Sequence, residues 1–284
     1  MKKILMDVRP NTVRVGVTEG GTLVEFWAEG VKTQRLVGNI YKGKVVNVLP
    51  GMQAAFVNLG LERNGFLFAG DTLVDDNQVS ELSSKQQLTL KEGDTVLCQI
   101  LKDEFGTKGA RITMNISIPG RLLVLMPYID YVGISRKIES EEKRDELTKL
   151  IESNRPEGFG YVVRTEAEHA TEEEIRHEIE MLTAKWLKIK DDYQSKECFS
   201  LLYSEEDMIS RVSRDMLRYD VEKVITNDEK TLTELRATIG PMLVKRPDLL
   251  ELYEGDENLF NFYGIYEQIA KLLNRKVVLK NGGY

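Results

Sequence analysis

The stretch from Leu36 to Asp71 limits what this chain can fold into more than any other part of the sequence. Short runs of alternating apolar and polar residues are separated there by glycine, proline and asparagine, a pattern typical of strands joined by tight turns. We predict three strands, at residues 40–49, 52–58 and 65–68. Two further runs, 94–103 and 109–117, follow a polar loop and complete a predicted five-stranded closed barrel.

The middle strand of this barrel separates an apolar face from a more polar one. Successive side chains of a strand point to opposite sides, so Ala55, Val57 and Leu59 share one face and Phe56 lies on the other. An aromatic ring can stack on a base, and nearby cations can bind phosphates. Single-stranded nucleic acid is therefore a candidate ligand, because basic residues are in excess between Lys32 and Phe66: Lys32, Arg35, Lys42, Lys44 and Arg63, against Glu62 alone.

The chain as a whole is acidic, with a formal net charge of −7. Non-specific affinity for nucleic acid comes mainly from cations that neutralise phosphates, so a site on this chain must be a local basic patch. Lys102, Lys108 and Arg111 at the last barrel hairpin would extend such a patch. A solvated charged hairpin is the alternative interpretation.

Cysteine usage and hydropathy indicate a reducing compartment and no membrane. Cys98 and Cys198 are far apart and form no CxxC, which favours neither a zinc site nor a disulfide framework. Cys98 shares a predicted strand face with apolar residues, so we expect a buried thiol. No apolar run approaches the roughly 20 residues that span a bilayer, and the first ten residues lack the apolar core of a signal peptide. We therefore expect a cytoplasmic protein without a membrane partner.

The segments around the barrel predict a second, mixed layer. Residues 2–8, 11–17 and 22–27 indicate an antiparallel meander. After the barrel comes an apolar strand in RLLVLMP, and then helices and strands alternate, which favours an α/β layer of RNase H-like type interrupted by the barrel. The predicted helices are 139–153, 171–192, 205–217, 227–239 with Asn227 as its N-cap, and 258–273; the predicted strands are 161–163, 220–226 and 249–253.

Arg164 and Thr165 form a candidate phosphate site at the end of a buried strand, GYVVRT. A guanidinium presents a planar fork of donors that matches phosphate oxygens, and the hydroxyl can donate to a further oxygen. The carboxyl end of a strand in an α/β sheet is also a common ligand crevice. On the residues alone, a surface salt bridge from Arg164 to Glu166 or Glu168 is the favoured alternative.

Asp7 and two arginines have both a functional and an ordinary interpretation. Asp7 lies on the first strand, where RNase H-type nucleases place a metal ligand, but no second strand-borne carboxylate is suitably spaced, so a solvated aspartate is favoured. Arg211 and Arg214 lie on one helical face and could contact phosphate or pair with neighbouring acids. We assign no metal-binding or catalytic residue in this chain.

Several words of the sequence together resemble the ribonuclease E/G family, most closely its ribonuclease G branch because nothing indicates a long disordered tail. These words are GNIYKGKVVNVLPGMQAAFVNLG, ERNGFLFAGD, PGRLLVLMP, GISRKIE and YVVRT, in the family's order and approximate spacing. The resemblance implies an RNase H-like α/β domain at 1–35 and 211–284, a barrel of the OB type (ribosomal-protein S-one version) at 36–118, and a 5′-sensor region at 119–210.

The resemblance also implies site residues. In the family, aromatics at the positions of Phe56 and Phe66 and lysines of the last barrel hairpin hold single-stranded RNA; to these we add the basic residues of the first strand. A pocket around the VRT word senses a 5′-monophosphate, completed by an arginine that this chain does not contain. The expected RNA-binding residues are Phe56, Phe66, Lys102, Lys108, Lys42 and Lys44, and the expected 5′-phosphate residues are Arg164, Thr165, Val124 and Gly120.

The implied activity is magnesium-dependent cleavage of single-stranded RNA in RNA processing and decay, by an enzyme that can form homo-oligomers. The magnesium-binding aspartates of the family lie in a later DNase I-like subdomain, and this sequence ends in KVVLKNGGY, partway through a predicted hairpin. We therefore expect the chain alone to bind RNA without cleaving it. A stand-alone RNA-binding protein is the alternative, and a small nuclease built on Asp7 is a third hypothesis.

Overall fold

The computed structural model describes residues 2–30, 35–72, 89–217, 220–239, 243–244, 246–277 and 283. The chain forms two compact units, one of residues Met1–Arg35 and Glu206–Tyr284, the other of Leu36–Glu205. The second unit is therefore an insertion in the first. The finer predicted boundaries, after residues 118 and 210, stay predictions. Most of the polar loop after Asp71 and most of the predicted terminal hairpin lie outside the described residues.

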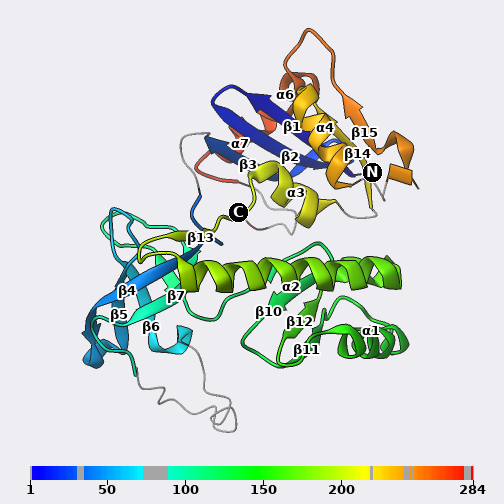
Figure 1. Ribbon diagram of the computed structural model, residues 1–284. Coiled ribbons are helices and arrows are strands. Elements are labelled where there is room, and N and C mark those ends of the chain that lie inside the picture. Colours follow the sequence, from blue (N-terminus) through cyan, green and yellow to red (C-terminus); the bar gives the residue numbers. More distant parts are fainter. Residues whose placement is uncertain are drawn as a thin grey trace. The chain divides into compact units, whose positions relative to one another are not determined.

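The first unit contains a five-stranded mixed sheet in the order β15-β14-β1-β2-β3 (Figure 1). The predicted meander is present as three antiparallel strands, and β14 and β15 continue the sheet in parallel with β1. Alternation along β1 places Ile4 and Met6 in one apolar cluster and Leu5 in another, on opposite faces of the sheet. The strands are β1 Lys2–Arg9, β2 Thr12–Glu19, β3 Thr22–Gly30, β14 Val221–Thr226 and β15 Leu250–Leu252.

The helices of this unit are α3 Met208–Met216, α4 Glu229–Thr238, α6 Leu259–Phe262 and α7 Ile265–Leu272. Two predictions about them are wrong. The N-cap of α4 is Asp228, whose carboxylate accepts from the Thr231 N–H, because the Asn227 side chain is bonded to β1 instead. The predicted helix 258–273 is two helices, because Gly264 adopts a left-handed φ of 63° between them.

The second unit contains the predicted closed barrel. Its strands follow one another in the order β4-β5-β6-β8-β7, and β7 pairs with β4 to close the ring, consistent with an OB-like fold. Ala55, Val57 and Leu59 are buried in the interior as predicted. A further strand, β13 Leu201–Tyr203, pairs antiparallel with the beginning of β4. The strands of the barrel are β4 Ile40–Leu49, β5 Ala54–Asn58, β6 Gly65–Phe68, β7 Thr95–Lys102 and β8 Arg111–Thr113.

Cys98 on β7 is buried, as its position on an apolar strand face predicted. Burial raises the pKa of this thiol to about 12. It is therefore a packing residue of the barrel interior.

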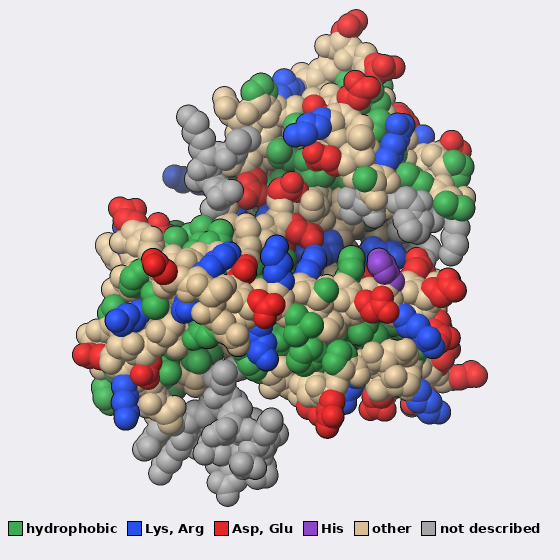
Figure 2. Space-filling model, in the orientation of Figure 1, with side chains coloured by type: hydrophobic (Ala, Val, Ile, Leu, Met, Phe, Trp, Pro, Cys, Tyr) green, Lys and Arg blue, Asp and Glu red, His purple; other side chains and the backbone are tan. Residues whose placement is uncertain are grey.

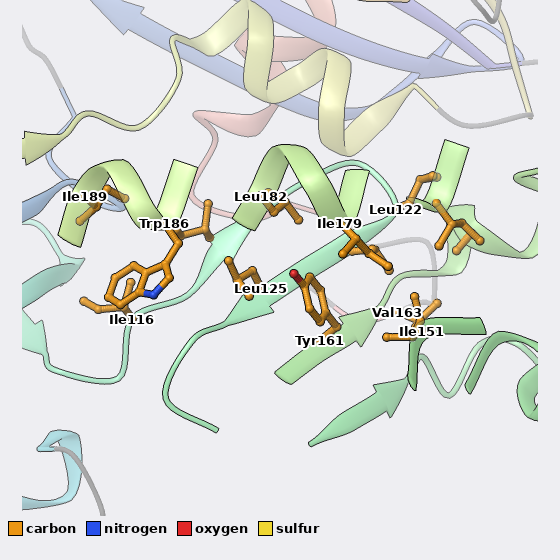
Figure 3. Packing of buried hydrophobic residues seen from close by; sticks show 14 of the residues in the cluster. Ile116, Leu122, Leu125, Ile151, Tyr161, Val163, Ile179, Leu182, Trp186 and Ile189 are labelled. Atoms are coloured by element: carbon orange, nitrogen blue, oxygen red, sulfur yellow. The ribbon is translucent and has the colours of Figure 1, made fainter. Parts of the chain in front are cut away.

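A four-stranded sheet, in the order β11-β12-β10-β9, follows the barrel in the same unit. The long helix α2 packs on this sheet along a stripe of apolar side chains, with Ile179, Leu182 and Trp186 pointing at the strands (Figure 3). A capping box at Thr171 and Glu174 starts α2. The elements are β9 Ile118–Pro119, β10 Leu123–Met126, β11 Val132–Ile134, α1 Glu141–Asn154, β12 Gly160–Val163 and α2 Glu172–Ser195.

Among the described residues, no helix is both long enough and apolar enough to cross a bilayer.

Candidate nucleic-acid interface

A row of side chains crosses the outside of the barrel. Strand register makes each of its members the direct partner of the next, from β4 through β5, β6 and β8 to β7. Two aromatic rings lie in the middle of the row, an amide at one end and two cations at the other. We call this set the barrel row: Asn47, Phe56, Phe66, Arg111 and Lys102.

The two aromatic residues of the barrel row form a half-buried pair. The ring centroids of Phe56 and Phe66 are 5.8 Å apart, and the ring planes meet at 66°. Such an edge-to-face pair holds both rings in place while leaving part of each exposed. The ring of Phe56 is thus partly exposed and not sealed inside hydrophobic packing. Such exposure is what the RNA-binding interpretation requires.

Phe68 extends this aromatic surface. It lies two residues after Phe66 on β6, so it points to the same side, and 40% of it is exposed. Its partner across the sheet is Ala54. Sequence reasoning missed Phe68, although its spacing from Phe66 was a readable signal.

The predicted lysines of the interface fall into two groups. Lys44, Lys102 and Lys108 are exposed. Lys42 instead donates from Nζ to the carbonyls of Tyr193 and Lys196, at 2.7 Å each, where it satisfies backbone acceptors at the end of α2. This geometry does not support an RNA contact for Lys42, and we leave it out of the proposed surface.

Arg111 makes an ion pair with Asp71, with an Nη2–Oδ2 distance of 2.8 Å. The pair fixes the guanidinium beside Phe66 but also offsets part of its charge. Acidic and basic side chains are mixed over the visible surfaces of both units in Figure 2, in keeping with the negative net charge. The cations around the barrel row are thus a local feature.

The second predicted site gathers at the carboxyl end of β12. Arg164 follows this strand, and its Nη1 donates to the Gly120 carbonyl at 2.7 Å. The hydroxyls of Thr165 and Ser135 are 3.1 Å apart. The structure thus brings Arg164, Thr165 and Gly120 to one place and adds Ser135, which sequence reasoning missed. Val124 is half-buried on β10, where it pairs with Val162, the residue before the last one of β12.

A buried acid bonds to the backbone that follows Gly120, next to this site. Glu178 on α2 accepts hydrogen bonds at Oε1 from the N–H groups of Leu122, at 2.7 Å, and Leu123, at 2.9 Å. Burial raises its pKa, against the opposing effects of those bonds and of Arg121 and Arg164. Glu178 was also missed, although a carboxylate at helical spacing within the apolar stripe of α2 is an unusual feature that the sequence displays.

Asp7 is neither solvated, as the sequence favoured, nor placed as a metal ligand. It is fully buried at 0% exposure, and its Oδ1 accepts from Arg9, at 3.0 Å, and from Asn227, at 3.2 Å. The Arg14 guanidinium is 4.0 Å from its other oxygen. Asp7 is a partnered ion, which is how a buried carboxylate is normally kept in a fold.

The two arginines of α3 are paired with acids. Arg211 binds Glu29 at 2.7 Å, and Arg214 binds Asp215 at 3.0 Å. Across the parts of the chain that the structure describes, no three histidine, cysteine or acidic side chains are grouped so that they could hold a metal ion.

The sequence matches the ribonuclease E/G family over residues 117–284. It is also 38% identical to ribonuclease G of Haemophilus influenzae over 288 aligned residues, which cover 99% of this chain. This chain belongs to the ribonuclease E/G family. That result confirms the family resemblance of the sequence segments in the barrel and after it.

Other members of the ribonuclease E/G family match at similar levels. Ribonuclease G of Escherichia coli is 35% identical over 99% of this chain, and ribonuclease E of Haemophilus influenzae is 34% identical over all of it. The alignments cover 59% of each ribonuclease G and 31% of that ribonuclease E. The chain thus spans little more than half the length of the ribonuclease G relatives, and any activity of the whole family protein is a proposal for it.

Proposed function

We propose that this chain is the RNA-binding and 5′-end-sensing N-terminal portion of an endoribonuclease that cleaves single-stranded RNA in RNA processing and decay. The observation that carries the proposal is the barrel row, in which two partly exposed rings lie beside cations on a closed barrel. Bases stack on such rings whatever their identity, and the cations follow the phosphates. The names of the relatives, ribonuclease G and ribonuclease E, support RNA as the ligand.

The place around Arg164 is the proposed 5′-monophosphate pocket. Its guanidinium supplies charge and directed donors, and the Thr165 and Ser135 hydroxyls can donate to phosphate oxygens. Gly120 contributes its carbonyl oxygen, which accepts the bond from Arg164 Nη1 and holds the guanidinium in the proposed pocket. A 5′-hydroxyl end offers no charge to this pocket, so the pocket would distinguish the two kinds of RNA end.

The first unit is proposed to be the RNase H-like domain of the family. Its support is the sheet order, in which an antiparallel meander is extended on one side by two parallel strands. The predicted boundaries at residues 118 and 210 remain part of this proposal.

Magnesium does not fit the acids of the described residues. Asp7, the one strand-borne candidate, already has its oxygens bonded to Arg9 and Asn227 and lies near a second arginine. A hard divalent cation needs several oxygen ligands. We therefore propose that the metal-binding aspartates belong to the part of the relatives beyond this chain, and that the complete protein acts in the cytoplasm and can form homo-oligomers.

The test is a comparison of binding and cleavage by the purified chain. A labelled single-stranded RNA with a 5′-monophosphate should bind more tightly than the same RNA with a 5′-hydroxyl, and both more tightly than a blunt duplex. Added salt should weaken all three. With Mg²⁺ the RNA should stay intact. Equal affinity for single and double strands would refute the barrel assignment, and robust cleavage would refute the separation of binding from chemistry.

A further inference from the structure

Glu178 is a buried acid on the face of α2 that packs against the sheet. Its side chain is buried on α2, within the stripe that otherwise presents Ile175, Ile179 and Leu182 to the sheet. Burying a carboxylate is costly unless its oxygens are bonded. The bonds that it makes therefore indicate its role.

One oxygen of Glu178 holds the turn between β9 and β10. Oε1 accepts from the N–H groups of two successive residues, Leu122 and Leu123. The turn is closed by the Gly120 N–H, which donates to the Leu123 carbonyl at 2.8 Å. The backbone N–H groups of Gly120, Leu122 and Leu123 are thus fixed, the last two by the side chain of Glu178 on α2.

Gly120 lies between Glu178 and Arg164. A Cβ atom at Gly120 would be 2.2 Å from Glu178 Oε1, closer than non-bonded heavy atoms approach, so the carboxylate occupies the space of the missing side chain. The Gly120 carbonyl in turn accepts the bond from Arg164 Nη1. A continuous set of contacts therefore connects the core of α2 to the guanidinium.

We propose that Glu178 is a positioning residue for the 5′-phosphate pocket, an inference that rests on the proposed function. By fixing the turn, it sets the direction of the Gly120 carbonyl, which orients Arg164. A guanidinium is planar, and the bond from Nη1 to the Gly120 carbonyl limits how that plane can turn when the group meets phosphate oxygens. Glu178 itself does not touch the phosphate.

The acceptor oxygen of Glu178 and its negative charge should have different effects on the pocket. The acceptor oxygen holds the turn, whereas a negative charge near Arg164 opposes the binding of an anion. Glutamine has the same carbonyl oxygen without the charge, so it should hold the turn equally well. Alanine has neither.

The test measures the ratio of the dissociation constants for 5′-hydroxyl and 5′-monophosphate forms of one single-stranded RNA. E178A should lower this preference about fivefold or more, because the turn that orients Arg164 loses the oxygen that accepts from its two N–H groups. Affinity for the 5′-hydroxyl RNA should stay within twofold, because the barrel is untouched. E178Q should keep the preference. E180A, which changes an exposed acid of the same helix, is the matched control.

A second pair of variants tests the contact with Gly120. G120A should abolish the preference, because its Cβ meets Oε1. Adding E178A to G120A should then cost less than the two single effects combined, since each removes the same arrangement. If E178A does not fold, as judged by circular dichroism, G120A and E178Q carry the test.

The outcomes distinguish the inference from the proposed function. If the unaltered chain shows no preference for the 5′-monophosphate, the pocket assignment fails. If it shows the preference and E178A keeps it, or E178Q loses it as E178A does, the positioning role is overturned while the pocket stands. Equal losses for both RNA ends in E178A would also overturn it, because they indicate a general structural effect.

Discussion

The barrel row and the pocket around Arg164 lie in the same compact unit but are held together in different ways. Neighbouring members of the barrel row are register partners, so the backbone ladder of the barrel aligns them. The pocket depends on bonds from side chains to backbone, and Gly120, Arg164 and Glu178 come from three separate elements. The barrel should therefore tolerate loss of one side chain as a local loss, whereas the pocket should fail as a unit.

The two sites should also differ in what they recognise. Stacking on the barrel row is possible for any base along a strand, whereas the pocket can meet only a terminal phosphate. Variants of the first should weaken all RNA equally, and variants of the second should change only the dependence on the 5′ end. The predictions below test that separation.

The largest effect is expected from the double variant Phe56→Ala and Phe66→Ala. Stacking is worth roughly 1–3 kcal/mol per base, so loss of two rings should weaken RNA binding about thirtyfold or more. Fluorescence anisotropy with 5′-monophosphate and 5′-hydroxyl RNA should show the same loss for both ends. Phe262→Ala, which removes an exposed ring of the other unit, should have no effect. A loss confined to one kind of 5′ end would contradict the separation.

Arg164→Ala should have the next largest effect, and only on one ligand. Removing a charge-assisted contact of about 1.5–3 kcal/mol should weaken binding of the 5′-monophosphate RNA roughly tenfold to a hundredfold. Binding of the 5′-hydroxyl RNA should be unchanged in the same titration. Arg176→Ala provides the control, since Arg176 is an exposed arginine of α2 paired with Glu172. Equal losses for both ends would remove Arg164 from the pocket.

Phe68→Ala should have a smaller effect that depends on the length of the RNA. Phe68 lies beside the Phe56–Phe66 pair on the same side of β6, so it would stack the next base along the strand. We expect a loss of about fivefold, equivalent to roughly 1 kcal/mol, for an RNA of about twelve nucleotides. An RNA of about three nucleotides should be unaffected. Equal losses at both lengths would place Phe68 within the central stacking pair instead.

The difference between the two sites also explains what could be predicted from the sequence. Strands at 40–49 and 65–68 were predicted with their observed bounds, because alternation and turn residues are local signals. The same alternation placed Phe56 on the outer face. The closed barrel followed from the number of such runs, although β8 proved shorter than predicted.

The residues that sequence reasoning missed, or to which it gave another role, depend on contacts between distant segments. Glu178 bonds to residues more than fifty positions away, and no pattern within α2 indicates the turn that it holds. Lys42 was predicted to bind RNA from its charge, but its ammonium reaches the end of α2. Asn227 is a good N-cap residue that is bonded to β1 instead, so the next residue caps the helix. In each case a tertiary partner outweighed a local preference.

The smallest effect concerns the pH dependence of stability at Glu178. Burial raises the pKa of this carboxyl from its ordinary value of 4.5. The folded chain therefore binds the proton more tightly than the unfolded chain, so the stability contributed by the protonated form is complete below about pH 4.5 and is lost as pH rises through the folded pKa. Glutamine has no proton to lose, and E178Q should be free of this loss.

Thermal unfolding of the two proteins between pH 4 and pH 8 measures the effect. The difference in Tm, E178Q minus the unaltered chain, should become more positive as pH rises; about 1 kcal/mol corresponds to roughly 2–4 °C in a domain of this size. Other titrating groups are common to both proteins and cancel in the difference. A difference that stays constant over this range would mean that the Leu122 and Leu123 N–H groups, with Arg121 and Arg164, fully offset the burial of the charge. The ionised Glu178 that positions the pocket would then not lower the free energy of unfolding.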